Sequence, residues 1–237
     1  MSGDVSAQTP IVLVPGLACS ARLYLPQLPA LWRFGPVMVA DHTRDDSLPA
    51  IARRILDAAP PHFALAGLSM GGYVSMEIMR QAPERVLRLA LLDTTAQPET
   101  PAQTERRRAQ IALAETGRYA EVLDQQYLSL VHIDRHGDTA LRALVDVMAE
   151  EVGAEAFVRQ QKAIMGRPDS RESLARVICP ATVIVGDGDT LTPPDKAEEI
   201  AAVIPGAKFV VIPDCGHLST LERPEAVTAA LEGWLGS

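Results

Sequence analysis

The chain has 237 residues, of which 47% are hydrophobic and 22% charged, so it can form one full hydrophobic core with an inserted subdomain, and we do not expect two equal domains. Its formal net charge of -8 repels nucleic acid and anionic membrane surfaces, which favours a small-molecule partner. The three cysteines are widely spread without a CxxC spacing, so neither a disulfide scaffold nor a zinc site is indicated.

The first ten residues have neither the cationic start nor the long apolar stretch of a secretory signal. No later apolar run approaches the length that spans a membrane. We therefore expect a cytoplasmic protein.

Short apolar runs alternate with segments of helical period in residues 1–96, which we assign to the first part of the core. This alternation is typical of βαβ units around a parallel sheet. The runs lack polar alternation because both faces of a helix-covered parallel sheet are buried. The predicted strands are Ile11–Val14, Val37–Ala40, Phe63–Ala66 and Leu87–Leu92, and the predicted helices lie near 48–58 and 70–81.

Residues 97–168 contain no convincing strand, and their apolar side chains recur at helical spacing. We therefore predict a helical insertion there. A helical insertion between two strands of an open sheet commonly covers the site at the edge of that sheet. The basic run Arg106–Arg108 lies on a predicted helix, where charges usually face water. Candidate pocket walls are Tyr127, Leu128, Met148 and Met165 of this insertion, with Leu17, Tyr24 and Met70 from the core loops, although core packing explains the same residues equally well.

The strand pattern resumes in residues 169–237, the second part of the core. Strands are predicted at Ala181–Val185 and Phe209–Ile212, with helices near 194–203 and 224–235. The apolar runs thus predict a reduced sheet of about six strands.

Ser69 lies in Gly-x-Ser-x-Gly, directly after a buried strand and before a helix. In a nucleophile elbow the serine occupies a strained turn, and glycines two residues before and after leave room for close backbone packing. A serine hydroxyl is a poor nucleophile at neutral pH, so it needs a base and a third group that orients that base.

His217 is our candidate for the base, because it follows the last predicted strand at the carboxyl edge of the sheet. His42 also follows a predicted strand and is the alternative candidate for the base. His132 and His136 lie four residues apart on a predicted helix, a spacing that metals use, but no third ligand is evident and we expect no metal site. Cys215, close to His217, is more simply a small buried side chain than a thiol nucleophile.

For the third group, the loop Gly186–Pro193 offers two carboxylates, of which motif position favours Asp189 over Asp187. Asp93, at the end of an earlier strand, is a third candidate. The negative charge that develops on a substrate oxygen needs fixed donors, and the expected pair is the backbone N–H groups of Met70 and Leu17.

Together these motifs resemble the α/β-hydrolase family over nearly the whole chain. The order Ser69, Asp189, His217 matches the family's order of nucleophile, acid and histidine, and residues 67–72, 186–193 and 216–225 resemble its three site motifs. The resemblance implies the α/β-hydrolase fold, with a mostly parallel sheet and the insertion as its cap. Two departures are Pro15-Gly16, where many relatives carry His-Gly, and the lack of the antiparallel strands that open many relatives' sheets.

The resemblance implies a serine hydrolase that cleaves a small carboxylic ester or lactone through an acyl-enzyme on Ser69. No cofactor or metal is implied. Alternatives are a carbon–carbon bond hydrolase, a lyase or a perhydrolase with the same triad, or a ligand-binding protein of this fold without catalysis.

Overall fold

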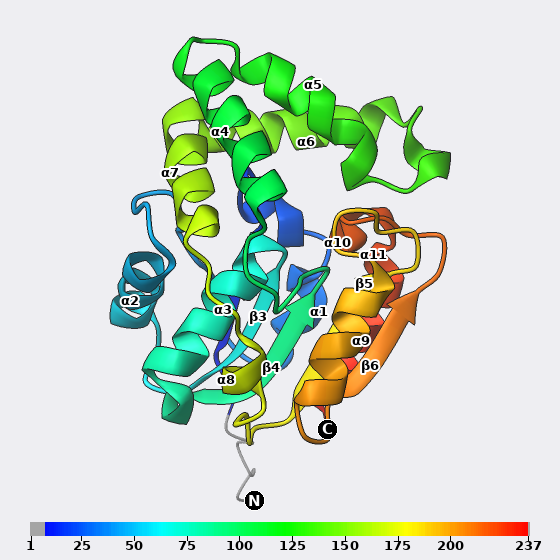
Figure 1. The fold of residues 1–237 in the computed structure, drawn as a ribbon. Helices are drawn as coiled ribbons and strands as arrows, with labels where there is room; N and C mark the ends of the chain where they lie inside the picture. The colour runs from blue at the N-terminus through cyan, green and yellow to red at the C-terminus, as the bar shows by residue number, and fades with distance from the viewer. Residues whose placement is uncertain (1–7, 237) are drawn as a thin grey trace, which may run out of the picture.

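The computed structural model describes residues 8–236, and within them six parallel strands form one sheet of order β2-β1-β3-β4-β5-β6 (Figure 1). The predicted α/β-hydrolase fold with a reduced sheet is confirmed. Each predicted strand is present, and β3 continues two residues beyond Ala66, directly to Ser69. The strands are β1 (Ile11–Val14), β2 (Val37–Val39), β3 (Phe63–Leu68), β4 (Val86–Leu92), β5 (Ala181–Gly186) and β6 (Lys208–Ile212).

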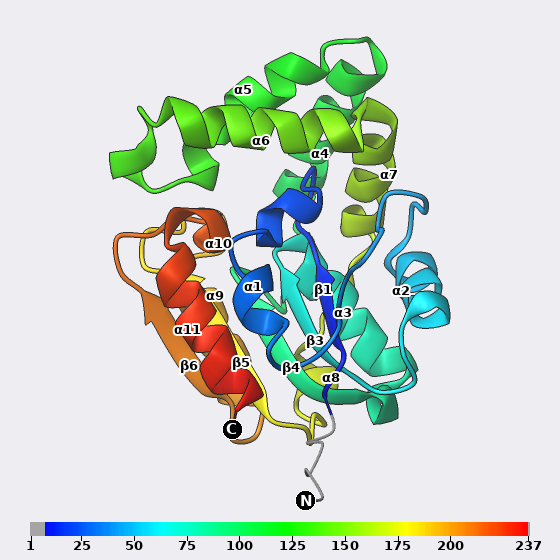
Figure 2. The same ribbon diagram turned by 180° about the vertical axis from the view of Figure 1, so that it is seen from behind.

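Helices cover both faces of the sheet. Alternate side chains of each strand enter opposite core clusters: Val12 packs in the cluster that contains Val74 of α3, and Leu13 in the cluster that contains Trp234 of α11. Since both faces are covered, β1, β3 and β5 are buried along their whole length, whereas the edge strand β6 exposes Phe209 and Val211. One face carries α2 (Leu48–Ala58), α3 (Met70–Gln81), α8 (Arg171–Leu174) and α9 (Pro194–Val203), and the other carries α1 (Leu28–Leu31) and α11 (Pro224–Leu235) (Figures 1 and 2).

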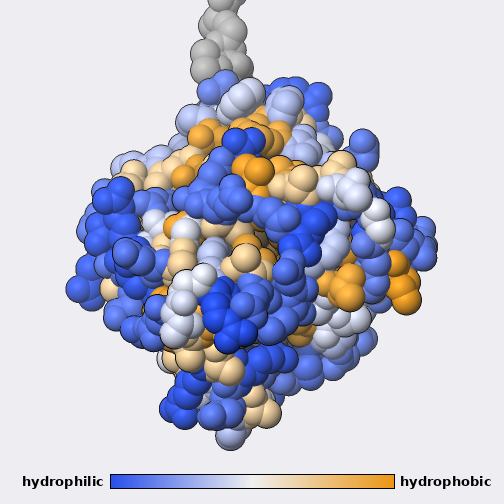
Figure 3. Space-filling view, turned by 90° about the horizontal axis from the view of Figure 1, so that it is seen from above, coloured by the Kyte–Doolittle hydropathy of each residue, from blue (hydrophilic) through white to orange (hydrophobic). Residues whose placement is uncertain are grey.

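The helical insertion follows β4 and covers the carboxyl edge of the sheet (Figure 1). It has a small core of its own, in which Phe157 is fully buried beside Ile111 and Val122. Its outer face is mostly hydrophilic (Figure 3), so the apolar stripes of its helices point inward. The insertion comprises α4 (Pro101–Glu115), α5 (Tyr119–Leu130), α6 (Thr139–Val152), α7 (Ala154–Met165) and α8, which packs on α3 and α9. The boundaries 97 and 168 stay predictions.

One predicted helical segment is wrong. His132 and His136 do not share an α-helix, because the chain between α5 and α6 forms a single 3-10 turn, Ile133–Arg135, which the two histidines flank. α5 ends where Val131 becomes extended, and the Asp138 side chain starts α6 by accepting the N–H of Leu141. Shorter segments complete the fold: 3-10 turns at Ala21–Tyr24 and Pro83–Arg85, and α10 (Ser219–Glu222).

Candidate active site

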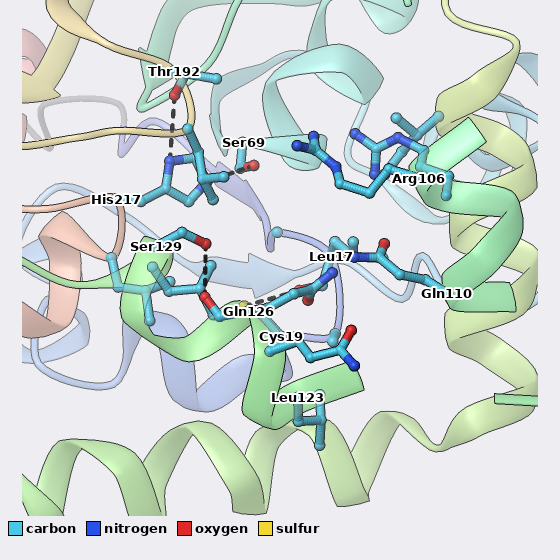
Figure 4. A pocket seen from close by; sticks show the side chains of 18 of the residues that line it. Leu17, Cys19, Ser69, Arg106, Gln110, Leu123, Gln126, Ser129, Thr192 and His217 are labelled. Atoms are coloured by element: carbon cyan, nitrogen blue, oxygen red, sulfur yellow. Dashed lines mark hydrogen bonds between the residues drawn. The ribbon is translucent and has the colours of Figure 1, made fainter. Parts of the chain in front are cut away.

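A cavity of about 560 Å³ lies between the carboxyl edge of the sheet and the insertion. Ser69 and His217 lie on its sheet side, and α4 and α5 contribute the opposite walls (Figure 4). The volume falls within the range of about 300–1,000 Å³ that small-molecule sites occupy. The loops that follow parallel strands therefore meet at one enclosed space.

Ser69 joins β3 directly to α3 in a strained turn, with φ 56° and ψ -114°. Its flanking glycines are needed because a Cβ on Gly67 would lie 2.2 Å from the Gly71 carbonyl oxygen, and one on Gly71 would lie 2.0 Å from that of Val14. The Ser69 N–H donates to the Leu92 carbonyl, which holds the turn on the neighbouring strand. The strain at Ser69 is thus stabilised by backbone contacts on both sides.

His217 links Ser69 to Asp189. The loop between β6 and α10 carries the buried imidazole, whose Nε2 lies 2.8 Å from Ser69 Oγ and whose Nδ1 lies 2.8 Å from Asp189 Oδ2. A carboxylate can only accept, so the proton of the neutral ring belongs on Nδ1. Nε2 then accepts from the serine hydroxyl, which is the geometry that a general base requires.

Asp189 is held by four hydrogen bonds. Oδ2 accepts from His217 Nδ1 and from Thr192 Oγ1, the latter at 2.7 Å. Oδ1 accepts the backbone N–H groups of Leu191 and Thr192, at 2.8 and 3.0 Å. All the accepting positions of the carboxylate are occupied, so its charge and orientation are fixed. Thr192 was not predicted, although an Asp-x-x-Thr spacing in a turn is a signal for such a contact.

The two rival carboxylates have other partners. Asp187 Oδ1 accepts the N–H of Cys215 at 3.1 Å, which ties the acid loop to the histidine loop. Asp93 is fully buried and accepts the Gly186 N–H at 2.9 Å, and its other oxygen meets Ser219 Oγ. The geometry therefore pairs Asp189 with His217 and leaves the other two as braces of the surrounding loops.

Burial and charge act against each other on the pKa values of this pair. Burial lowers the pKa of His217, but the Asp189 carboxylate outweighs it and the pKa ends above its usual value. Burial raises the pKa of Asp189, but the charge and hydrogen bond of His217 bring it below its usual value. Burial, together with repulsion from Asp189, raises the pKa of Asp93 to about 8.

Cys215 lies within two residues of His217, but it is fully buried, and burial raises the pKa of its thiol well above the usual range. The thiolate form that a nucleophile needs is thereby disfavoured. Cys215 contributes a small buried side chain to the core.

The N–H groups proposed as oxyanion donors belong to Met70, which follows Ser69 in the chain, and to Leu17, on the loop after β1. Met70 is the first residue of α3, where backbone N–H groups have no carbonyl partner within the helix. Leu17 lines the cavity from the loop after β1. The role of each N–H as an oxyanion donor stays a prediction.

The loop that carries Leu17 is fixed from two directions. Ala18, at φ 57°, donates its N–H to Oε1 of Gln160, a fully buried residue of α7, at 3.0 Å. His42 Nε2 lies 2.9 Å from the Gly16 carbonyl oxygen and 3.1 Å from Gln160 Nε2. His42 therefore supports this loop and does not contact Ser69. Gln160 was not predicted, because only the fold brings it next to Ala18, 142 residues earlier.

Of the seven predicted pocket walls, Leu17 lines this cavity, whereas Met70 and the other five do not. Tyr24 is buried beneath it, with its hydroxyl on the Val14 carbonyl, and Met148 lies in the core. Tyr127 and Leu128 line a separate outer depression, and Met165 packs against the small core of the insertion. These five side chains pack in a core or at the outer depression, whereas other members of the same apolar stripes line the cavity. The apolar lining comes from Leu68, Leu113, Leu123, Leu130, Val145, Ile164, Leu191 and Leu218, together with Leu17.

The basic run faces water at Arg106 and Arg108, which are both exposed as expected, whereas Arg107 is half-buried and paired with Glu99. Arg106 and Arg107 line the cavity, and only Arg108 points away from it. One polar face of α4 points toward the cavity. Its side chains are spaced three or four residues apart, from Gln103 through Arg106 and Arg107 to Gln110. Helical periodicity could not reveal this, since the insertion has water on one side and a cavity on the other.

Residues 8–236 include no group of three or more His, Cys, Asp or Glu side chains arranged to hold a metal ion. None of their helices is long and apolar enough to cross a lipid bilayer.

Residues 11–230 match the model of the Alpha/beta hydrolase family. The chain belongs to this family. A pimeloyl-[acyl-carrier protein] methyl ester esterase of Nitrosomonas europaea is 26% identical over 79% of this chain and 77% of its own. A putative non-heme bromoperoxidase of Mycobacterium tuberculosis is 28% identical over 74% of this chain and 68% of its own.

Among solved structures, a thermophilic esterase from Thermogutta terrifontis, solved with malate bound, superimposes with a TM-score of 0.88. It is 28% identical, and the match covers 96% of this chain and 89% of that one. The comparisons thus establish an alpha/beta hydrolase, and its relatives differ in the reactions that their names describe.

Replacing Asp189 by Asn should lower kcat by several powers of ten, since the imidazole loses its charge partner and its fixed tautomer. Because Asp189 raises the pKa of His217, wild-type kcat/KM should fall as the pH drops through that raised pKa. In D189N the residual kcat/KM should fall at a lower pH than in wild type, because the pKa of His217 is no longer raised by Asp189. Asp187→Asn is the control, and steady-state pH profiles on both variants are the measurement. A larger loss in D187N than in D189N would reverse the assignment of the acid.

Replacing Gln160 by Ala should free the N–H of Ala18 and loosen the loop that presents Leu17. We expect kcat to fall about 10-fold with little change in KM, less than the ~100-fold loss on deleting an oxyanion donor outright. Lys162→Ala, exposed on the same helix, is the matched control. Unchanged kcat in Q160A, with the variant folded by circular dichroism, would contradict the role given to Gln160.

Proposed function

We propose that this alpha/beta hydrolase cleaves a small carboxylic ester or lactone through an acyl-enzyme on Ser69. The observation that carries the proposal is the continuous chain from Ser69 Oγ through the buried imidazole to Asp189, with both contacts at 2.8 Å, opening into a closed-over cavity. The names of the esterase relative and the esterase structure support the same reaction class.

In the first half-reaction, Ser69 Oγ attacks the ester carbonyl as its proton passes to His217 Nε2. The N–H groups of Leu17 and Met70 stabilise the negative oxygen of the tetrahedral intermediate. The carbon–oxygen bond to the alcohol then breaks, and the imidazolium returns the proton to that oxygen. Asp189 stabilises the imidazolium throughout without taking its proton.

In the second half-reaction, water gives its proton to His217 and its oxygen to the acyl carbon. The bond to Ser69 Oγ breaks, and the imidazolium protonates the serine as the carboxylic acid leaves. A lactone follows the same steps, with its alcohol remaining attached to the acyl group. Neither half-reaction requires a metal or an organic cofactor.

A fluorophosphonate probe tests the proposal directly. We expect one covalent adduct, mapped by mass spectrometry to Ser69 and absent from Ser69→Ala, whose turnover of an aryl ester should fall at least about 1,000-fold. An adduct on another residue, or full turnover of the ester by S69A, would refute the proposal. Specific ligand binding without turnover of any ester or lactone in a panel would favour a binding protein of this fold.

A further inference from the structure

The charge of the cavity wall differs from that of the whole protein. The chain has 30 acidic and 22 basic residues. Among the described residues that line the cavity there is no Asp or Glu, whereas two are arginines, Arg106 and Arg107. An acidic protein therefore surrounds a cavity whose only formal charges, His217 aside, are positive.

The nearby carboxylates are already paired. Glu99, 3% exposed at its side chain, binds both Arg107, at 2.9 Å, and Arg167. Glu105 lies 3.5 Å from Arg108, on the outer side of α4. One buried carboxylate thus balances two guanidinium groups, and the second carboxylate is directed away from the cavity.

Arg106 has no such partner. Within residues 8–236 it has neither an ion pair nor a hydrogen bond, while Arg107 and Arg108 on either side of it are paired. Figure 4 shows Arg106 and Gln110 on the side of the cavity opposite His217. The α4 face thus presents a solvent-exposed guanidinium without a protein partner on the wall of the cavity that also contains Ser69.

We propose that Arg106 binds a carboxylate at the far end of the substrate, so that the preferred substrates are esters or lactones whose acyl part carries a second, anionic carboxylate. A planar guanidinium can donate two parallel hydrogen bonds to a carboxylate. The free donors of Arg106 and the absence of acidic groups from the lining suit an anion. This inference rests on the proposed function, which supplies the position of the ester at Ser69.

The apolar residues of the lining account for the middle of such a substrate. Leu17, Leu113 and Ile164 line the same cavity as the two polar ends. A short methylene chain can bury its surface against them while its ester meets Ser69 and its carboxylate meets Arg106. The proposed ligand is therefore a monoester of a short dicarboxylic acid, or a lactone of a short hydroxy dicarboxylic acid.

The test compares two substrates of one size, methyl hydrogen glutarate and its neutral carboxamide analogue, methyl 5-amino-5-oxopentanoate. In wild type kcat/KM should favour the carboxylate by about 10-fold to 100-fold, the worth of a hydrogen bond to a charged group. Arg106→Met, which keeps an apolar stem, should abolish the preference, and Arg106→Lys should retain part of it. Arg108→Ala is the matched control and should leave the ratio unchanged.

A ratio near one in wild type, or an unchanged ratio in R106M, would overturn the inference while hydrolysis through Ser69 stood. Binding of glutarate to S69A by calorimetry tests the inference without turnover. We expect binding at least about 10-fold weaker when R106M is added to S69A. Equal affinity of the two proteins for glutarate would also overturn it. Turnover by S69A would refute the proposed function alone.

Discussion

The hydrogen bond between Asp189 and His217 is the contact on which the candidate site depends. It sets the tautomer of the imidazole, so that Nε2 is free to accept the Ser69 proton, and it keeps a charged carboxylate in a buried place. That carboxylate is tolerable because Thr192 and two backbone N–H groups complete its hydrogen bonds. The hydrogen bonds of Asp187 and Asp93 hold the loops of Asp189 and His217 next to each other. The strained turn at Ser69 places its hydroxyl against Nε2 of His217.

The core and the order of the site residues could be read from the sequence because short-range rules determine them. An apolar run bounded by turn residues has few solutions other than a buried parallel strand, and the six runs became the six strands of the described sheet. The elbow at Ser69 is a local motif, because its serine and both glycines lie within five residues. The distance of Asp189 from His217 follows from the fold, since loops after neighbouring strands meet at one edge.

The cavity wall could not be predicted in the same way. An apolar helical stripe has the same period whether it faces a core or a pocket, so Tyr24 and Met148 were indistinguishable from lining residues until the fold placed them in the core. Arg106 is exposed as expected, but the sequence did not show that it also lines the cavity, because a helical charge has the same spacing at a cavity wall as on an outer surface. Gln160 had no local signal, since its partner Ala18 is distant in sequence. Fold alone does not determine function, and the relatives of this chain carry names of different reactions.

The Asp189–His217 contact predicts a specific protonation state for His217 in the absence of substrate. Nitrogen NMR on protein labelled with ¹⁵N-histidine can assign both ring nitrogens and follow them with pH. We predict a neutral ring above its raised pKa with the proton on Nδ1, and a lower pKa together with loss of the fixed Nδ1–H in Asp189→Asn. A proton on Nε2 in the neutral wild-type ring, or a His217 pKa that does not change in D189N, would contradict the central role of the Asp189–His217 contact.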